Sequence, residues 1–356
     1  MLRTVSRWST AIAVAGLACS SGERSPASGA GANAGTTAAA GAAITGAGAT
    51  FPNPIYSKWF DAYARETGVR INYQSIGSGG GIRQFTEGTV DFGATDGPMT
   101  DEQIAAVHGD VLHVPTVLGA VVATYNLPSL GQKALRFDGP TLAEIFLGQI
   151  TKWNDPRLRA LNPGVALPAT DILVVHRSDG SGTSYIFTDY LSKVSPDWKT
   201  RVGHATSVNW PEGLGGKGNE GVTQQVKQSE GAIGYVELIY AISNGLPAAA
   251  MKNAAGAFVP ATLEGLSAAA AGIDLPAESD FRVSITNAAG PDAYPISSFT
   301  WLLIHRQDTT SAKQRAIHGF LLWMLQPAAQ RMAADLHYAP LPVKVIETVR
   351  HRLGAS

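Results

Sequence analysis

Hydrophobic and polar positions in this chain follow two periods, one typical of helices and one typical of strands, which alternate from residue 44 onward. Between residues 54 and 67 the aromatic and aliphatic residues fall on one helical face, which predicts an amphipathic helix ending at Gly68. The segment 69–73 alternates apolar and polar residues and is therefore expected to be a strand. The continuous apolar run at 172–175 predicts a strand buried on both faces, as in a parallel sheet.

The remaining chain continues this alternation. Two capping-box patterns, at 100–103 and 141–144, mark further helix starts. The C-terminal helices carry no site-like motif and are expected to cover a sheet. Short strands alternating with helices predict an α/β fold. Other expected helices lie at about 81–87, 183–194, 311–325 and 342–352, and other expected strands at 90–94, 232–236 and 299–304.

Composition and charge narrow the classes of function. A length of 356 residues allows two domains. The 27 basic and 28 acidic residues leave a formal charge of -1, so the net basic surface that nucleic-acid binding requires is missing and no nucleic-acid partner is expected. A small local anion site stays compatible with this balance. The single cysteine excludes a disulfide framework or a multi-thiolate metal site within the chain, and neither a metal nor a cofactor is expected.

The N-terminal residues 1–18 are typical of an export signal. Arg3 and Arg7 precede a short apolar run that is too short to span a bilayer as a mature helix. Cys19 follows at once, so the segment resembles a bacterial lipoprotein signal in which this cysteine is lipidated. Gly16 and Leu17 depart from the usual lipoprotein pattern, which leaves an ordinary secretory signal as the alternative. Both alternatives predict export.

Residues 19–43 consist almost entirely of small and polar residues after the cysteine. Such a segment buries too little apolar area to offset its ordering entropy, so a disordered tether is expected. No later run of 18 apolar residues occurs, and therefore no membrane-spanning helix is expected in the rest of the chain.

Three glycine-rich segments, 45–51, 76–81 and 177–183, each lead into a predicted helix. A turn of this kind presents free backbone N–H groups, and the helix dipole adds partial positive charge. Glycine allows the backbone to approach a ligand closely, and each segment also supplies a serine or threonine hydroxyl. Together the three segments predict an oxyanion site.

These segments differ from the known nucleotide-binding and catalytic loops. Gly216-Lys217 is followed by Gly218 where a phosphate-binding P-loop has a hydroxyl residue, and 77–82 lacks the third glycine of the dinucleotide fingerprint. Neither Ser78 nor Ser181 has the flanking glycines of a nucleophile elbow. The sequence therefore gives little support for catalysis, and we expect a protein that is not an enzyme.

Six motifs, taken in order along the chain, resemble the ligand loops of the phosphate-binding proteins of bacterial phosphate ABC transporters. The resemblance implies a type II periplasmic-binding-protein fold with two doubly wound α/β lobes joined by a hinge. Lobe 1 would comprise 44–118 and 294–356, and lobe 2 would comprise 119–293. It also implies a monomer in the periplasm or on the outer face of the cell membrane, with inorganic phosphate and the permease subunits as partners. The motifs are 45–52, 77–79, 91–96, 179–183, 210–219 and 231–237.

Carried over position by position, the resemblance implies a set of phosphate ligands. His176 stands where many relatives have a second arginine, which affects the expected electrostatics more than the assignment of its neighbour. Asp179 is expected to orient that neighbouring arginine. The implied phosphate-binding residues are Thr50, Phe51 through its N–H, Ser78, Asp96, Arg177, Asp179, Ser181, Gly182 through its N–H, and Thr183.

Asp96 is informative because a carboxylate should repel an anion. An ionised carboxylate only accepts hydrogen bonds, so it favours an oxyanion that carries a proton and disfavours sulfate, which carries none at neutral pH. This argues for phosphate and leaves arsenate, also protonated, as an alternative ligand. An exported phosphatase or phosphotransferase is the other alternative, but neither a nucleophile with a placed base nor a metal cluster is visible in the sequence.

Overall fold

The structure is a computed structural model that describes residues 43–354 apart from 132, 274, 277 and 307–310. The predicted export signal, Cys19 and the tether up to residue 42 lie outside this described part. Within it, strands and helices alternate, and the predicted α/β fold is confirmed. No helix in the described ranges has the length and apolar character needed to cross a bilayer.

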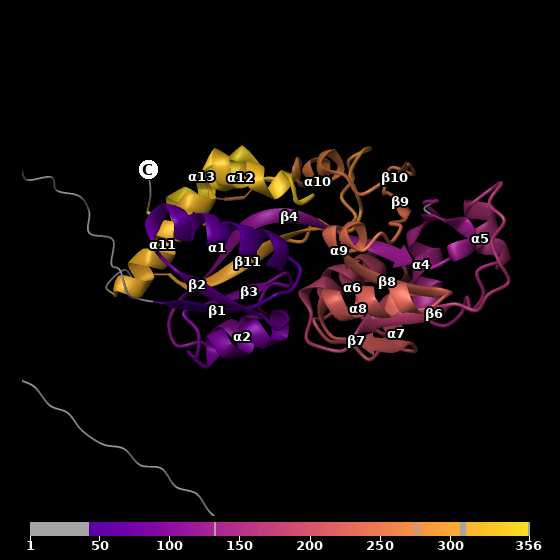
Figure 1. Cartoon of the computed structure of the whole chain (residues 1–356), viewed down its shortest axis with the longest axis horizontal. Helices are drawn as coiled ribbons and strands as arrows, with labels where there is room; N and C mark the ends of the chain where they lie inside the picture. Colours follow the sequence, from indigo (N-terminus) through magenta and orange to yellow (C-terminus); the bar gives the residue numbers. More distant parts are fainter. Residues whose placement is uncertain (1–42, 132, 274, 277, 307–310, 355–356) are drawn as a thin grey trace, which may run out of the picture. The chain divides into compact units, whose positions relative to one another are not determined.

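An eight-stranded sheet organises the described residues, in the order β2-β1-β3-β11-β4-β8-β6-β7 (Figure 1). The long strand β4 (Val111–Tyr125) is shared by its two halves. Through Ala120 it pairs with β11 (Ser297–His305), and from Val121 onward it pairs with β8 (Ala232–Glu237), antiparallel in both cases. The predicted lobes would meet at this strand, although their boundaries stay a prediction.

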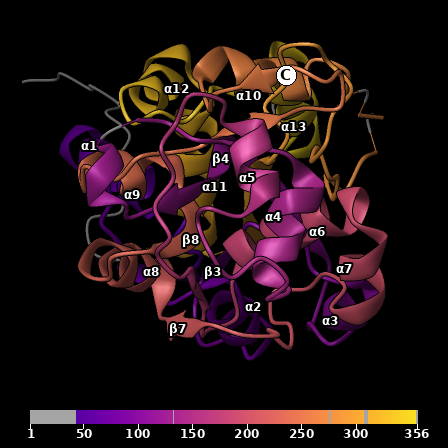
Figure 2. The same cartoon turned by 90° about the vertical axis from the view of Figure 1, so that its right-hand side faces the viewer.

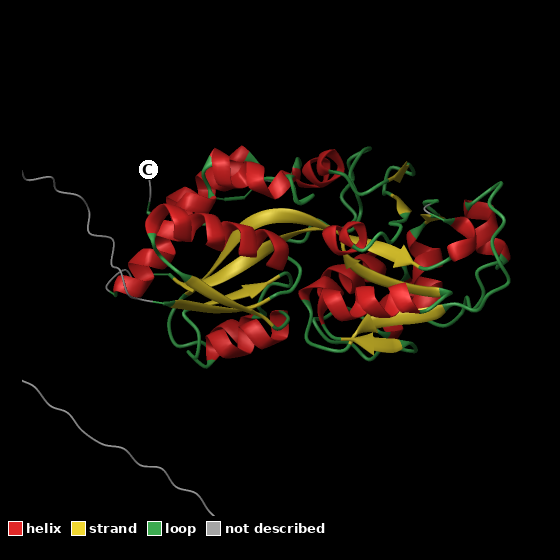
Figure 3. Cartoon of the chain, viewed as in Figure 1, coloured by secondary structure: helices red, strands yellow, loops and turns green. Residues whose placement is uncertain are grey.

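The first half of the sheet contains the parallel strands β1 (Ile44–Gly48), β2 (Ile71–Ser75) and β3 (Phe92–Thr95), together with β11. Helices α1 (Asn53–Thr67) and α2 (Ser78–Thr86) lie on opposite sides of these strands (Figure 3). The other helices of this half are α3 (Asp101–Ala105), α11 (Ala312–Met324), α12 (Pro327–Ala334) and α13 (Val343–Arg352).

Helix α1 buries the face predicted from its periodicity, and it ends at Gly68 in a left-handed conformation. The Trp59 ring is fully buried, and its Nε1 donates to the Ala329 carbonyl of α12 at 2.8 Å. Phe60 packs on Phe320 of α11 with the ring centroids 5.1 Å apart. The C-terminal helices therefore cover this half largely by packing on α1, and α11 also contacts β1.

The second half of the sheet contains β6 (Leu173–Arg177), β7 (Leu214–Gly216) and β8, which are parallel to one another. Figure 2 shows α8 (Gly218–Gln228) on one side of β8 and α6 (Gly182–Val194) on the other, and both contact it. The remaining elements here are α4 (Gly139–Phe146), α5 (Pro156–Leu161), α7 (Pro196–Arg201), α9 (Leu238–Ser243), α10 (Leu263–Ala270), the 3-10 helix Pro128–Leu130, and a small sheet of β5 (Arg136–Phe137), β9 (Ala250–Lys252) and β10 (Phe258–Val259).

Of the helix starts predicted at about residues 81, 100 and 141, one is right and two are displaced. The capping box of Thr100 and Gln103 is present at the start of α3, as predicted. The start expected at Thr141 is wrong, because Asp138 caps α4 by accepting from the Thr141 N–H, and the helix begins at Gly139. The short helix expected from about residue 81 begins at Ser78, so its first turn is the glycine-rich segment itself.

Candidate functional site

Loops from the two halves of the sheet meet at the carboxyl ends of their strands. The loop after β2 touches the loop after β6 directly, since the Gly79 N–H donates to the Gly180 carbonyl at 2.9 Å. The Gly182 N–H, at the start of α6, donates to Ser78 Oγ at 3.0 Å. The Gly77 N–H also donates to the Gly48 carbonyl at 2.8 Å, and the Asp96 N–H donates to Ser78 Oγ. The three glycine-rich segments and Asp96 are thereby brought together, and both halves of the sheet contribute to the candidate site.

The close approach of these loops requires glycine. A Cβ added to Gly182 would lie 2.6 Å from the Cβ of Asp96, and one added to Gly79 would lie 3.0 Å from the Gly180 Cα. Gly77 has a φ of +90° and would place its Cβ 2.3 Å from Asp179 Oδ2. Any side chain at these positions would separate the loops or force them to shift.

Asp96 follows β3 and is almost completely buried. Its Oδ1 accepts from the Thr300 hydroxyl of β11 at 2.8 Å, and its backbone N–H donates to Ser78 Oγ at 3.2 Å. Burial raises the pKa of Asp96 to about 7, although the Thr300 hydrogen bond, the charge of Arg177 and the Ser78 hydroxyl all favour the ionised form. The Asp96 carboxyl group therefore changes between its protonated and ionised forms close to neutral pH.

Arg177 ends β6 and has a side chain only 1 % exposed. Its Nε and Nη2 donate to the two carboxylate oxygens of Asp179 at 2.8 and 2.5 Å, so the predicted orienting contact is present as a bidentate pair. Burial alone would raise the pKa of Asp179, but the hydrogen bonds and charge of Arg177 and the Gly218 N–H outweigh it and hold that pKa below its usual value. The remaining nitrogen, Nη1, lies 3.3 Å from Thr183 Oγ1.

Thr50 and Thr183 lie in the same buried cluster and share a partner that sequence reasoning missed. Asn219, in the first turn of α8, donates from Nδ2 to Thr50 Oγ1 at 2.8 Å and to Thr183 Oγ1 at 3.1 Å. Asn219 closes the motif 210–219, so the sequence drew attention to the segment without giving the residue a role.

Phe51 and Ser181 have structural partners of their own. The Phe51 ring packs edge-on against Tyr338, while no acceptor in the described residues contacts the Phe51 N–H. Ser181 Oγ accepts from the Ser184 N–H and so caps α6, and the Ser181 N–H donates to the Thr206 carbonyl. The Ser181 hydroxyl still has its own hydrogen to donate while it serves as a cap.

Three stacked aromatic rings pack beside β6. The His176 ring lies parallel to Trp210, with centroids 4.9 Å apart, and Trp210 in turn stacks on Tyr235. The Tyr235 hydroxyl accepts from the Arg177 N–H at 3.0 Å. His176 thus serves in packing, as does Trp210.

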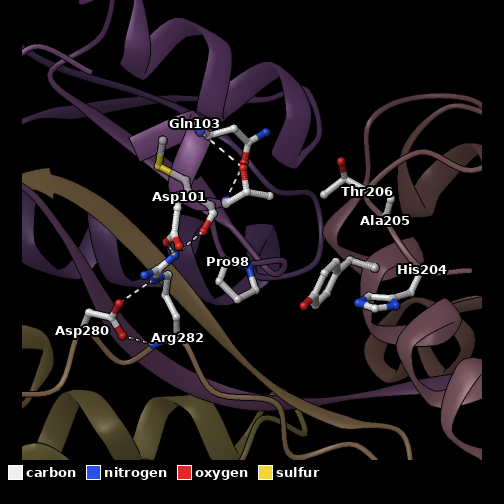
Figure 4. A pocket seen from close by; sticks show the side chains of 11 residues that line it. Pro98, Asp101, Gln103, His204, Ala205, Thr206, Asp280 and Arg282 are labelled. Carbon is white, nitrogen blue, oxygen red and sulfur yellow. Dashed lines mark hydrogen bonds and ion pairs between the residues drawn. The ribbon is translucent and has the colours of Figure 1, made fainter. Parts of the chain in front are cut away.

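A cavity of about 590 Å³ lies beside the meeting loops (Figure 4). Pro98 and Asp101 line it on one side and His204 and Thr206 on the other, and Tyr185 also belongs to its lining. Arg282 closes a third side through ion pairs with Asp101 at 2.7 Å and with Asp280 at 2.6 Å. None of the nine predicted phosphate-binding residues lines this cavity, because in this structure they are packed against one another.

Comparisons with known proteins agree with this architecture. A family model described as a PBP superfamily domain matches residues 31–328. The phosphate-binding protein PstS of Xylella fastidiosa (strain 9a5c) is 46 % identical over 306 residues, which cover 86 % of this chain and 83 % of that protein. The protein of the same name from Haemophilus influenzae is 45 % identical over 307 residues, which cover 86 % of this chain and 91 % of that protein.

Two solved structures show the same fold. The structure of a high-affinity periplasmic phosphate-binding protein, PfluDING, bound with phosphate has a TM-score of 0.69 at 21 % identity and covers 87 % of this chain and 93 % of its own. The structure of a phosphate-binding protein from Stenotrophomonas maltophilia has a TM-score of 0.67 at 20 % identity and covers 87 % of this chain and 93 % of its own.

Proposed function

The chain belongs to the PstS family of phosphate-binding proteins, within the PBP superfamily, and from this premise we propose what it binds and where. It binds inorganic phosphate between the loops that end β1, β2, β3 and β6, and it delivers the phosphate to the membrane permease of a phosphate ABC transporter. The phosphate ligands are the nine residues implied by the family resemblance: Thr50, Phe51, Ser78, Asp96, Arg177, Asp179, Ser181, Gly182 and Thr183.

The observation that carries this proposal is a group of buried donors without acceptors. Within the described residues, no acceptor contacts the hydroxyl hydrogens of Thr50 and Thr183 or the N–H of Phe51. An unpaired buried donor costs about 1 to 3 kcal/mol, so a ligand rich in acceptor oxygens offsets several such costs at once. A tetrahedral oxyanion has the required oxygens.

Asp96 selects among oxyanions by accepting a hydrogen bond from the ligand. Its carboxyl group lies beside Ser78 and Gly182, so a bound anion must place an oxygen near it. Hydrogen phosphate and dihydrogen phosphate can donate a hydrogen bond to the carboxylate, whereas sulfate presents only lone pairs. Arsenate also carries a proton, so Asp96 does not discriminate against it.

Transport requires that the permease recognises the occupied receptor. The contacts from Gly79 to Gly180 and from Gly182 to Ser78 join the two halves of the sheet, and phosphate adds further contacts across the same boundary. Binding would therefore favour the closed arrangement over an open one. We propose that this closed, monomeric form docks on the permease.

The location follows from the N-terminal segment. Residues 1–18 would direct export, Cys19 would carry a lipid, and residues 19–43 would tether the folded part to the outer face of the membrane or within the periplasm. Mass spectrometry of the mature N-terminus tests this: a diacylglyceryl-modified Cys19 is expected, and cleavage elsewhere without lipid would overturn the anchor.

Calorimetry on the purified mature protein tests the function. Phosphate is expected to bind at one site per chain, sulfate at the same neutral pH is expected to bind more weakly, and arsenate serves as the matched protonated competitor. The absence of phosphate binding would overturn the proposal. A release assay with a generic phosphomonoester tests the enzymatic alternative, since sustained turnover would mean that the site is catalytic.

A further inference from the structure

One buried amide connects the two halves of the candidate site. Asn219 is 0 % exposed and lies in the first turn of α8. From there it reaches Thr50, which follows β1, and Thr183, in the first turn of α6. These two threonines belong to opposite sides of β4, so a single side chain sets the distance between them.

The orientation of this amide is determined by its other partner. The Glu237 N–H donates to Asn219 Oδ1 at 2.9 Å. A backbone N–H can only donate, so the atom facing it must be the amide oxygen. The NH₂ group therefore faces the two threonines and gives one hydrogen to each.

The hydroxyl oxygens of Thr50 and Thr183 each accept two hydrogen bonds within the protein. Thr50 Oγ1 accepts from Asn219 N at 3.2 Å and from Asn219 Nδ2, while Thr183 Oγ1 accepts from Asn219 Nδ2 and from Arg177 Nη1. A hydroxyl oxygen accepts two hydrogen bonds and donates one. With both acceptor positions occupied, each hydroxyl can make a further hydrogen bond only by donating.

We propose that Asn219 is a positioning residue that commits the Thr50 and Thr183 hydroxyls to donate to the bound anion. This inference rests on the proposed phosphate function and adds a residue that acts through others instead of touching the ligand. Hydroxyls held in this way do not have to be reoriented when an acceptor-rich anion enters, which favours binding.

A thermodynamic cycle measured by calorimetry with inorganic phosphate separates this role from simple packing. Asn219→Ala is expected to weaken phosphate binding by about 10- to 100-fold, because two donors to a charged group lose their fixed orientation. Thr50→Val and Thr183→Val keep the side-chain shape and remove one hydroxyl each. In each valine background, and most of all in the double-valine variant, the cost of Asn219→Ala should shrink, because fewer hydroxyls remain for it to orient.

Asn162→Ala is the matched control. Asn162 is 4 % exposed and makes the same kinds of bonds, donating to the Arg136 and Leu158 carbonyls and accepting from the Arg136 N–H, with no contact to the threonines. It should lower the melting temperature and leave the phosphate affinity unchanged.

The outcomes are distinct. If the wild type binds phosphate and Asn219→Ala costs the same factor in every background, the residue is merely structural and the inference is wrong. An effect of Asn162→Ala on affinity equal to that of Asn219→Ala would refute it in the same way. If the wild type binds no phosphate, the proposed function fails first and this inference falls with it.

Discussion

The selectivity for phosphate over sulfate should depend on pH, because Asp96 changes its hydrogen-bonding role near neutrality. Burial raises the pKa of Asp96 to about 7, against the opposing effects of the Thr300 hydrogen bond, the Arg177 charge and the Ser78 hydroxyl. Below this pKa the carboxyl group can donate to an anion that carries no proton. Above it the carboxylate only accepts, so sulfate can bind only if the site takes up a proton.

The size of the effect follows from proton linkage. A ligand whose binding requires uptake of one proton loses about tenfold in affinity for each pH unit above the pKa. Sulfate should show this loss above about pH 7, whereas phosphate brings its own proton and should not. The ratio of phosphate to sulfate affinity should therefore be nearly constant below about pH 6 and rise about tenfold per unit above about pH 7.5.

Asp96→Asn removes the titration while it keeps the shape. The amide can both donate and accept at any pH, so the affinity ratio should become independent of pH and smaller at alkaline pH. Phosphate affinity should fall by about tenfold or somewhat more, since one hydrogen bond between a charged carboxylate and the ligand is weakened.

Calorimetry at constant ionic strength, repeated in two buffers of different ionisation enthalpy, gives the affinity and the number of protons taken up. Sulfate binding to the wild type above pH 7 should take up one proton, and binding to Asp96→Asn should take up none. A wild-type ratio that does not change with pH would refute this reasoning, as would an identical slope in the variant.

Three further predictions concern the contacts around the site. Arg177→Ala should lower phosphate affinity at least about 100-fold in calorimetry, since it removes a buried charged donor; nanomolar binding by this variant would place the site elsewhere. Gly182→Ala should weaken binding about tenfold or more and prevent the compaction seen by X-ray scattering when phosphate is added, because its Cβ would clash with Asp96. Arg282→Ala breaks the ion pairs to Asp101 and Asp280, whose side chains are 85 % and 51 % exposed, and the hydrogen bond to the Met99 carbonyl, so it should cost only about 1 kcal/mol of unfolding free energy. Because these contacts hold the segments 99–101 and 280–282 together beside the cavity, the variant should release phosphate faster in stopped flow, and an unchanged release rate would contradict this.

The sequence predicted the elements whose periodicity is strong and missed those that depend on pairing. The helix at α1 was predicted almost to the residue, because its aromatic face and Gly68 are local signals. The long strand β4 was missed, since Pro115 interrupts it and proline normally argues against a central strand. The structure accommodates Pro115 beside a β-bulge, where the register with β11 shifts between Thr300 and Trp301. The very short strands of the small sheet carry no periodic signal.

The sequence predicted the loops of the candidate site, but not the residues that hold the predicted ligands in place. Glycine with a hydroxyl residue before a helix is a local pattern, and the family resemblance placed the individual ligands on it. Thr300 and Asn219 lie in segments that the sequence singled out, yet their roles depend on contacts with residues about 200 and 170 positions away. No local pattern reports such contacts.

The electrostatics of the site explain how a chain of net charge -1 can hold an anion. The charge of Arg177 is matched by Asp179, and ionised Asp96 adds a negative charge, so the named charged groups do not give a positive cleft. Attraction must therefore come from donors whose direction is fixed: the Arg177 guanidinium held by Asp179, the Phe51 N–H and the hydroxyls of Thr50 and Thr183. Fixed donors discriminate more finely than charge does, because each must meet an acceptor in one place while Asp96 demands a donor in another. A cleft without excess positive charge is then a condition for this selectivity, since a strongly basic cleft would bind sulfate as well.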